Sequence, residues 1–450
     1  MWGKGKIVAD RSPEQVLAGM GVPPDFTAPP FIRWIHRSTG EAEIYFVASG
    51  AERATEALCA FRVTGRRPEF WQPETGKIEA AAAYEQSGGV TRIPMRFEPS
   101  GSVFVVFRKG AASFDPVVRV TLDGRQILPP PETKGDILIE KAVYGVPGDP
   151  KRTRDVRAKV QAIVDAGELS FRASRMAEGD DPALNVEKTL VVDYTVAGKR
   201  LKAGGRDPEI MTFESGPGAR LVAGVHAGDG GLSVEAWEPG RYELTTAAGR
   251  KAGAQVPVPP SALEITGPWE VRFPPGGGAP ERVIMEKLVS WSEHPDPGVR
   301  SFSGTAAFAN KIRVPRAMVG DNQHAYLDLG KVQVMAQVKL NGRDLGILWK
   351  SPYVMDVTGV LKAGDNDLEI RVTDLWVNRL IGDEQLPEDS DRNADGTLKA
   401  WPQWVIDGKP SPTGRFTFTS WRLWKKSDRL VESGLVGPVT LRVSEEVSAR

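Results

Sequence analysis

Cysteine is almost absent from this chain of 450 residues, and histidine is scarce. The single cysteine, Cys59, cannot form an internal disulfide bond and cannot supply a thiolate zinc site. It lies in an alternating apolar run with Phe61 and Val63, which predicts a buried strand position. The four histidines are far apart in the sequence, and no His-Glu-x-x-His pattern occurs. Metal chemistry based on cysteine or histidine is therefore not expected.

The chain also lacks net charge and long apolar runs. Lysine plus arginine and aspartate plus glutamate number 58 each, so no long-range field attracts nucleic acid or an anionic membrane. No stretch of about 18 apolar residues is present, which argues against a membrane-spanning helix. The first residues contain no apolar core of a secretion signal, so the chain itself gives no cellular address. We expect no nucleic-acid partner and no membrane partner.

Glycine and proline are abundant by contrast. The 48 glycines and 35 prolines suit many short strands joined by turns. Residues 28–131 contain several such strands, for example Ile44–Val47 and Val103–Phe107, and this spacing predicts an antiparallel β-sandwich. We therefore predict a mainly β chain of tandem β-sandwich domains with a small α+β insertion.

The residues before this sandwich predict a strand at 3–8 and then a helix. Ser12 can cap the helix, with Pro13 in its first turn and Gln15 at the capping-box position. One strand and one short helix cannot bury a core alone. Residues 1–27 are therefore interpreted as the tail of a preceding α/β domain.

The residues after the first sandwich divide into two segments. Residues 132–210 are predicted to form an inserted small β-rich domain, with a helix at 154–166 where apolar residues have helical spacing. Residues 211–260 are interpreted as return strands followed by a proline-rich linker.

Residues 261–450 carry the clearest strand pattern. Apolar and polar residues alternate over Val332–Leu340, which predicts one strand with one wet face. This run leads into Asn341 and Gly342, the preferred pair for a type I′ hairpin turn. Similar alternation at 368–373 and 439–444 predicts an all-β sandwich.

Motifs in this last region resemble the sugar-binding jelly roll of family 2 glycoside hydrolases. They are Gly304–Phe308, Tyr326–Gly330, Val338–Gly346 and Ser351–Thr358. Further motifs resemble the C-terminal region of glycoside hydrolase family 106, the α-L-rhamnosidases. They are Gly267–Phe273, Trp291–Asp296, Trp376–Asp383 and Ser433–Pro438, and Ile32–Gly40 resembles the preceding sandwich. The resemblance implies a galactose-binding-like jelly roll at 261–450.

The resemblance has one large departure. In family 106 the catalytic carboxylates, and a calcium ion that helps to bind rhamnose, belong to a preceding barrel domain. Such a (β/α)₈ barrel needs about 250 residues of alternating strands and helices, and this sequence has no such pattern. No catalytic residue can therefore be assigned.

The resemblance thus implies the non-catalytic C-terminal portion of a glycoside hydrolase, which braces a catalytic barrel and contributes to carbohydrate binding. Its implied partners are a plant-type oligosaccharide or polysaccharide and a barrel domain in the same or another chain. It also implies a parent enzyme that is periplasmic or secreted. Two alternatives stay open: a stand-alone array of carbohydrate-binding modules, or a structural or interaction protein without a ligand.

Tryptophans crowd the region that follows the predicted strand at 368–373. They are Trp376, Trp401, Trp404, Trp421 and Trp424. Flat rings stack on sugars while nearby Asn, Asp and Arg side chains bind hydroxyls, although packing in a core or a domain interface is the more common role of tryptophan. The predicted substrate-binding residues, on a loop or sheet edge and beyond, are Trp376, Asn378, Arg379, Asp383, Trp421 and Trp424. Arg379 and Asp383, spaced i, i+4, could equally form an ion pair that pins the loop.

One acidic stretch matches the first half of a calcium-binding loop. Asp391, Asn393 and Asp395 occupy positions 1, 3 and 5, and Gly396 follows. Position 12, which should be a bidentate Glu, is Pro402. We therefore predict a surface turn and assign no metal ligand, with at most weak calcium binding at this stretch.

Overall fold

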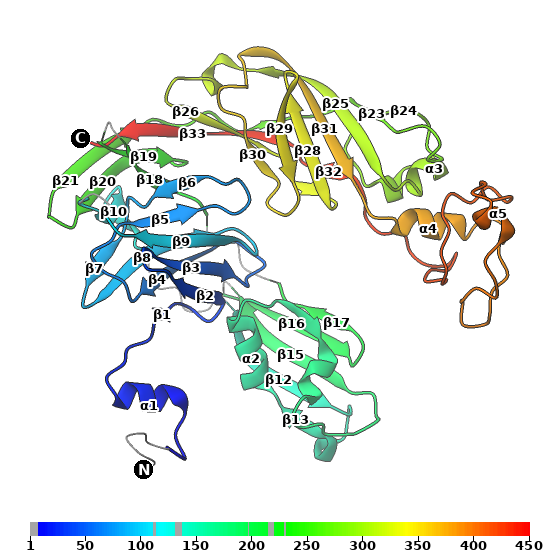
Figure 1. The fold of residues 1–450 in the computed structure, drawn as a ribbon, viewed down its shortest axis with the longest axis horizontal. Helices are drawn as coiled ribbons and strands as arrows, with labels where there is room; N and C mark the ends of the chain where they lie inside the picture. Colours follow the sequence, from blue (N-terminus) through cyan, green and yellow to red (C-terminus); the bar gives the residue numbers. More distant parts are fainter. Residues whose placement is uncertain (1–7, 111–113, 131–136, 197, 215–219, 229–230) are drawn as a thin grey trace. The chain divides into compact units, whose positions relative to one another are not determined.

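The computed structural model describes residues 8–110, 114–130, 137–196, 198–214, 220–228 and 231–450. The fold is mainly β, with several sheets arranged as sandwiches and few helices, as the sequence predicts (Figure 1). The chain divides into two compact units, Met1–Pro257 with Val447–Arg450, and Val258–Glu446. Each unit is described by itself. The finer five-part division expected from the sequence stays a prediction.

The first sandwich of unit 1 has two antiparallel sheets, ordered β2-β3-β9-β5-β6 and β1-β4-β8-β7. Their bounds are β1 Phe26–Thr27, β2 Ile32–Ser38, β3 Ala42–Ser49, β4 Thr55–Phe61, β5 Pro68–Trp71, β6 Ile78–Ala80, β7 Glu85–Ser87, β8 Val90–Phe97 and β9 Ser102–Arg108. Tyr45, Cys59 and Phe61 are fully buried between the sheets, so the predicted buried position of Cys59 is confirmed. Burial raises the pKa of the Cys59 thiol to about 12.

A second group of strands in unit 1 comes from both sides of an inserted segment. The sheet β11-β10-β20-β21 joins strands from either side of that segment. The hairpin β18–β19 packs against this sheet. Their bounds are β10 Val117–Leu122, β11 Arg125–Leu128, β18 Ala223–Gly228, β19 Gly231–Ala236, β20 Gly240–Thr246 and β21 Lys251–Val256. Val120, Val234 and Leu244 are among the residues of their shared core.

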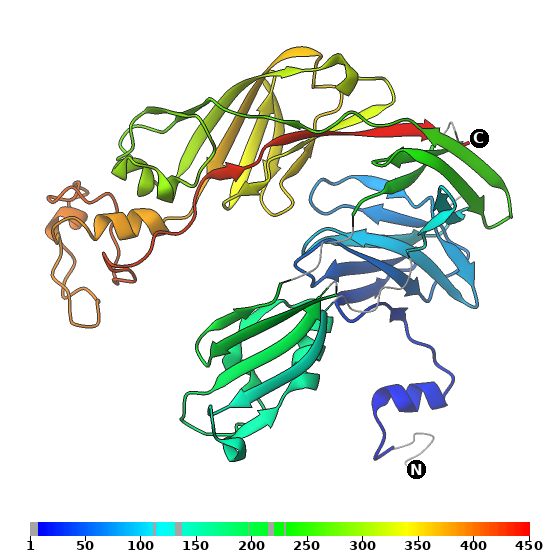
Figure 2. The ribbon, with the colours of Figure 1, turned by 180° about the vertical axis from the view of Figure 1, so that it is seen from behind.

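The inserted segment has a core of its own. Its antiparallel sheet has the order β13-β12-β15-β16, and Figures 1 and 2 show helix α2 against one face of it. The bounds are β12 Ile137–Gly145, η1 Pro150–Arg152, β13 Thr153–Asp155, α2 Arg157–Asp165, β14 Ser170–Arg172, η2 Ala173–Ala177, β15 Thr189–Val196, β16 Lys199–Arg206 and β17 Ile210–Thr212. The predicted helix is confirmed, because α2 buries Val160, Ile163 and Val164 at helical spacing.

The capped helix near the start is also confirmed as α1, Pro13–Gly19. The Ser12 side chain accepts from the Gln15 amide, and the Gln15 side chain returns a bond to the Ser12 amide. The helix buries none of its residues. Most of the strand predicted at 3–8 lies outside the described residues.

Unit 2 is a sandwich of two sheets. One is ordered β24-β23-β25-β31-β28-β29, and the facing sheet contains β22, β33, β26 and β30. The bounds are β22 Leu263–Glu264, β23 Trp269–Arg272, β24 Arg282–Met285, η3 Trp291–Glu293, α3 Pro297–Arg300, β25 Thr305–Val314, η4 Arg316–Met318, β26 Gln323–Asp328, β27 Lys331–Val332, β28 Met335–Leu340, β29 Arg343–Leu348, β30 Val354–Asp356, β31 Gly364–Thr373, β32 Leu435–Gly437 and β33 Thr440–Ser448. Phe308, Ile370 and Leu441 meet in the core between the sheets.

The turn between β28 and β29 is confirmed, whereas the strand before it is corrected. Asn341 and Gly342 have φ values of 52° and 79°, as a type I′ turn requires. The single strand predicted over Val332–Leu340 is broken, because Val334 adopts a positive φ of 70°. Residues 331–332 pair with β32 and residues 335–340 pair with β31, so the chain changes sheets at Val334.

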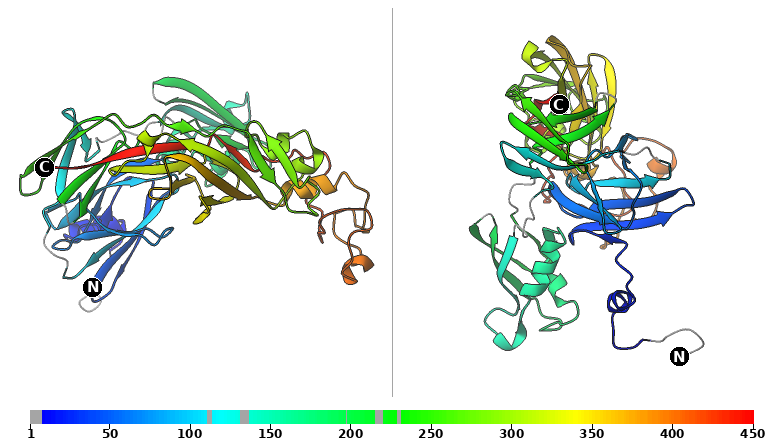
Figure 3. Two further views of the ribbon diagram at one scale, coloured as in Figure 1. Left: turned by 90° about the horizontal axis from the view of Figure 1, so that it is seen from above. Right: turned by 90° about the vertical axis from the view of Figure 1, so that its left-hand side faces the viewer.

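Unit 2 also contains a long irregular segment, residues 384–432, which we call the C-terminal excursion. It leaves the sandwich after helix α4, Val377–Asp383, and returns at β32. Its only described helix is the single turn α5, Gln403–Ile406. Figures 1 and 3 show it projecting beyond the ends of the strands of unit 2. Among the residues described, no helix is both long and apolar enough for a membrane crossing.

Candidate functional site

The predicted Trp376–Asp383 segment directly follows strand β31, as expected from the sequence. It is a helix, α4, and not a loop or a sheet edge. Trp376 precedes the helix and leaves 61% of its surface exposed, while Asn378, Arg379 and Asp383 face inward. Its inward polar residues have partners within the excursion and on the chain that returns from it.

Asn378 joins the helix to the returning chain. Its side chain is 1% exposed, and its amide nitrogen donates to the Val431 carbonyl at 2.8 Å and to Ser433 Oγ at 3.1 Å. Its Oδ1 accepts from the Val431 amide at 2.8 Å. The amide group therefore closes the base of the C-terminal excursion, where residues 384–432 begin and end.

Arg379 and Asp383 form a buried ion pair. Arg379 Nε lies 3.0 Å from Asp383 Oδ1, and the Arg379 guanidinium lies over the Phe416 ring, 4.5 Å from its centroid. Asp383 Oδ2 accepts from the Phe416 and Thr417 amides and from the Thr417 hydroxyl, at 2.7–3.0 Å. Burial lowers the pKa of Arg379, and the adjacent Asp383 opposes that shift. The pair pins Phe416 and Thr417 of the excursion to α4.

The five tryptophans of this region do not form a core. None of them is among the buried residues, and Trp376 and Trp421 are more than half exposed. Trp421 Nε1 donates to the Asp395 carbonyl at 2.9 Å, which fixes one edge of its ring. Trp401 and Trp404 both lie against Phe418, each with ring centroids 5.6 Å apart. Trp376, Trp401 and Trp421 are therefore exposed at the surface, and Trp404 and Trp424 are partly exposed.

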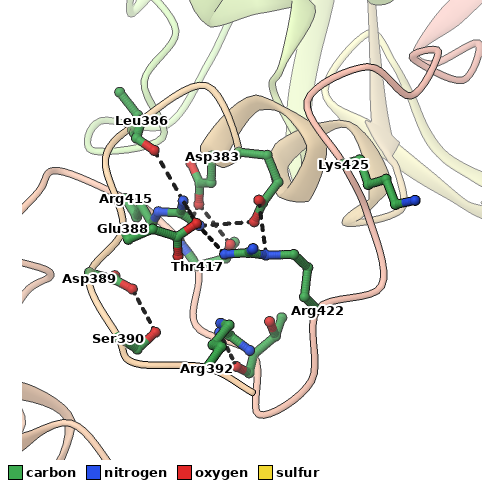
Figure 4. Close-up of polar contacts among 12 residues, drawn as sticks. Asp383, Leu386, Glu388, Asp389, Ser390, Arg392, Arg415, Thr417, Arg422 and Lys425 are labelled. Carbon is green, nitrogen blue, oxygen red and sulfur yellow. Dashed lines mark hydrogen bonds and ion pairs between the residues drawn. The ribbon is translucent and has the colours of Figure 1, made fainter. Parts of the chain in front are cut away.

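A hollow in the excursion brings together charged residues that the sequence did not single out (Figure 4). Arg415 Nη1 lies 2.9 Å from Glu384 Oε1, and Arg422 Nε lies 3.1 Å from Glu384 Oε2. Arg422 also pairs with Glu388, which lies 3.7 Å from Arg415. The hollow is lined by Leu380, Asp383, Glu384, Asp389, Arg392, Arg415, Thr417, Phe418, Thr419, Arg422, Leu423 and Trp424. Two of the predicted site residues, Asp383 and Trp424, are part of this lining.

Arg392 differs from the other two arginines of the hollow. Its guanidinium donates to the carbonyls of Gly396 at 3.0 Å and Thr419 at 2.6 Å, and no ion pair to it is found among the described residues. Burial, and then the charge of Arg422, lower its pKa, while nearby carboxylates oppose them. Its Nε is buried without a hydrogen-bond partner.

The stretch that begins like a calcium loop is a small hairpin. The Asn393 amide donates to the Thr397 carbonyl at 2.8 Å, and Arg392 pairs with Leu398. Asp395 Oδ1 accepts from the Thr397 amide at 3.0 Å and from its hydroxyl at 2.7 Å. In the described part of the chain, no three histidine, cysteine or acidic side chains cluster as metal ligands would.

Comparisons with known proteins relate this chain to rhamnosidases. A family model described as alpha-L-rhamnosidase matches residues 1–86. The rhamnosidase structure from Novosphingobium sp. PP1Y is 26% identical, with a TM-score of 0.54, over 98% of this chain and 27% of that one. The chain resembles glycoside hydrolase family 106, the α-L-rhamnosidases. The family match lies at the N-terminal end of this rhamnosidase-like chain and includes Ile32–Gly40, so it agrees with the resemblance of the first sandwich and is not confined to C-terminal motifs.

A second relative has a different provisional name. A Formosa agariphila protein, provisionally named beta-glucuronidase, is 30% identical over an alignment 541 positions long, which covers 100% of this chain and 46% of that protein. The rhamnosidase-like chain therefore spans less than half of this curated relative. The three comparisons together relate it to glycoside hydrolases.

Proposed function

We propose that this chain is a non-catalytic portion of a rhamnosidase-like glycoside hydrolase. Its sandwiches support a catalytic barrel, in the same or another chain, and contribute to binding a plant-type oligosaccharide or polysaccharide. The observation that carries this proposal is the match along 98% of this chain to only 27% of the Novosphingobium rhamnosidase. The antiparallel sheets of the described residues agree with such a supporting role, because a (β/α)₈ barrel is built from parallel strands.

The six predicted substrate-binding residues divide into two roles in this proposal. Trp376 and Trp421 expose large ring surfaces that can stack on a sugar, as does Trp424 in part. Asn378, Arg379 and Asp383 hold the excursion in place, because they are buried and make hydrogen bonds or an ion pair with internal partners.

The decisive experiment is hydrolysis of 4-nitrophenyl α-L-rhamnoside by the purified chain at verified mass, with calcium present. We expect no turnover from the chain alone. Turnover that disappears when acidic residues within 261–450 are substituted would contradict the proposal, since these sandwiches would then perform the chemistry themselves.

The binding contribution has a separate test with matched variants. Trp376→Ala and Trp421→Ala should weaken binding of a rhamnose-containing oligosaccharide, whereas Trp349→Ala should not, although Trp349 is equally exposed in unit 2. Asn378→Ala should instead lower the melting temperature. Unchanged binding in both Trp376→Ala and Trp421→Ala would leave a structural role for these rings.

A further inference from the structure

The five-stranded sheet of the first sandwich has an outer face to which the proposed function gives no role. Its strands β2, β3, β9, β5 and β6 lie side by side in this order (Figure 1). Alternate residues of each strand point to opposite faces of the sheet. The inner face, with Tyr45, Val105 and Phe107, packs into the core of the sandwich, and the residues between these form the outer face.

One row of residues crosses this outer face from edge to edge. Each member lies directly opposite the next in the register of the strands. The row, which we call the apolar row, consists of Ile35, Phe46, Phe104, Trp71 and Ile78, from β2 to β6. None of the five belongs to the core between the two sheets, and Ile35 and Ile78 are 47% and 54% exposed. The sheet therefore presents an apolar surface across its whole width.

The six-stranded sheet of unit 2 has an outer face of the opposite kind. A row that also crosses from one edge strand to the other consists of Arg282, Arg272, Ala307, Arg371, Gln337 and Ile347. Its arginines pair with carboxylates on the same face, for example Arg272 with Glu270 and Arg371 with Glu369. Such a polar face is the usual one for an antiparallel sheet in contact with water. The apolar row departs from this pattern, and an apolar patch of this kind marks a surface that another molecule covers.

The polar residues beside the apolar row are of two kinds. Trp71 Nε1 donates to Glu69 Oε2 at 2.9 Å, and Arg108 Nη2 lies 2.7 Å from Glu69 Oε1, so this carboxylate is already paired. At the β2 edge, Arg33 and Arg37 flank Ile35 on the same face. Both arginines are exposed, and neither has an ion pair within the part of the chain that the structure describes. These two positive charges suit an acidic rim on the molecule that covers the face.

The shape of the apolar row favours a protein surface over a sugar polymer. The rings of Phe46 and Phe104 have centroids 4.9 Å apart and are tilted by 52° to one another. A saccharide chain stacks on flat, parallel ring faces. Tilted rings form an uneven surface instead, into which the side chains of a protein domain can interdigitate as they do in a core.

The relatives of this chain contain a protein region large enough to cover the face. The family match at residues 1–86 includes four of the five members of the apolar row, and the whole chain covers only 27% of the Novosphingobium rhamnosidase. Most of that enzyme therefore has no counterpart here. In the proposed function, the region without a counterpart includes the catalytic barrel.

We propose that the outer face of the sheet β2-β3-β9-β5-β6 is the docking surface for the catalytic domain. The apolar row lies at the centre of this interface, and acidic residues of the catalytic domain lie opposite Arg33 and Arg37. This inference rests on the supporting role in the proposed function and adds the surface through which the first sandwich performs it.

The test mixes the whole chain with the part of the Novosphingobium rhamnosidase that it does not match, produced as a separate chain, and measures their complex by sedimentation velocity. The unsubstituted chain should bind, and Ile35→Ser with Ile78→Ser should weaken binding by about tenfold, which corresponds to 1.4 kcal/mol. The matched control is Ile284→Ser with Ile347→Ser, at isoleucines 49% and 57% exposed on the edge strands of the unit 2 sheet. The control should bind like the unsubstituted chain. Equal affinity of the two double variants would overturn the proposal.

A second measurement decides the matter if the separate rhamnosidase part does not fold. Serine at the two positions of the intact Novosphingobium rhamnosidase that align with Ile35 and Ile78 should lower its melting temperature by several degrees, because the row is covered there. Ile35→Ser with Ile78→Ser should leave the melting temperature of the present chain unchanged, because the two side chains are exposed. An intact rhamnosidase that is unaffected would overturn the proposal.

Other occupants of the face would give different results. Self-association of the chain alone that Ile35→Ser with Ile78→Ser abolishes would make a second copy the occupant. Binding of a rhamnose-containing oligosaccharide that the same double variant abolishes would make the face a sugar site. Either result would overturn the proposal, whereas hydrolysis of 4-nitrophenyl α-L-rhamnoside by the chain alone would contradict only the proposed function.

Discussion

The sandwich of unit 2 and the C-terminal excursion that leaves it are stabilised in opposite ways. The sandwich buries apolar residues from two sheets, with Trp291 and Phe308 stacked at 6.1 Å in its centre. The excursion has little regular structure, and buried ion pairs and side chain to backbone hydrogen bonds hold its limbs together. In the sandwich, each buried side chain is stabilised by contacts with many neighbours. In the excursion, each buried polar group depends on one partner.

The largest effect should come from the core of the sandwich. Phe308→Ala removes a fully buried ring and should cost about 3–5 kcal/mol of unfolding free energy, measured by chemical denaturation followed by tryptophan fluorescence. The matched change Phe418→Ala in the excursion should cost less, because Phe418 packs mainly between Trp401 and Trp404 and is partly exposed. Equal losses from the two variants would remove the distinction between the regions.

The next effect should come from the base of the excursion. Asp383→Ala leaves the buried Arg379 without its counter-ion and removes the acceptor of three hydrogen bonds to Phe416 and Thr417. We expect a local loss of about 3 kcal/mol, seen as faster hydrogen exchange and proteolysis within residues 384–432.

The control for Asp383 is an exposed ion pair in the same excursion, Asp407 with Lys409 at 2.9 Å. Asp407→Ala should change neither measurement, since exposed pairs contribute little. The double variant Arg379→Met with Asp383→Leu should be less damaging than Asp383→Ala alone, because it leaves no unpaired charge. If the double variant is more damaging than Asp383→Ala, the ion pair stabilises the fold by more than the cost of leaving the Arg379 charge unpaired.

The sequence predicted the sandwich of unit 2 much better than the C-terminal excursion. Period-two alternation identified β31 and β33, and Asn341 with Gly342 identified the turn, because these signals are local. Alternation failed at Val334, where the side-chain pattern continues while the backbone changes sheets. No local propensity signals such a crossing.

The hollow of the excursion was missed for a physical reason. Glu384, Arg392 and Arg422 are far apart in an irregular segment, so no periodicity relates them. The i, i+4 spacing of Arg379 and Asp383 was visible, and the structure contains that ion pair. The helix that carries them was expected as a loop, because its inward polar residues find partners about 30 to 50 residues later, which sequence spacing cannot reveal.

A smaller effect concerns Asp374, which lies just before α4 and holds the returning chain. Its carboxylate accepts from the Leu375 amide at 2.7 Å and from the Gly434 amide at 2.8 Å, and burial raises its pKa above the ordinary value of 3.8. Asp374→Asn replaces one accepting oxygen by a donor and should cost about 1 kcal/mol near neutral pH.

The pH dependence of that difference has a definite sign. Because the folded pKa of Asp374 is raised, its carboxyl group stabilises the fold most when protonated, below its unfolded pKa. That contribution is lost as the pH rises through the folded pKa. The unsubstituted chain should therefore lose stability relative to Asp374→Asn as the pH rises above about 4, measured by denaturation at a series of pH values. The opposite slope would mean that the two backbone donors outweigh the effect of burial.

The smallest effect should come from the exposed hairpin of the excursion. Asp395 has its Oδ1 engaged by Thr397, and these hydrogen bonds lower its pKa. Position 12 of the motif is Pro402, which has no side-chain oxygen to complete a calcium site. We therefore expect calcium, compared with a chelator, to leave the melting temperature of the chain unchanged, and Asp395→Ala to alter only exchange at the Thr397 amide. A calcium-dependent rise in melting temperature that Asp395→Ala abolishes, and Asp407→Ala does not, would instead make this hairpin a third kind of region, ordered by a metal ion.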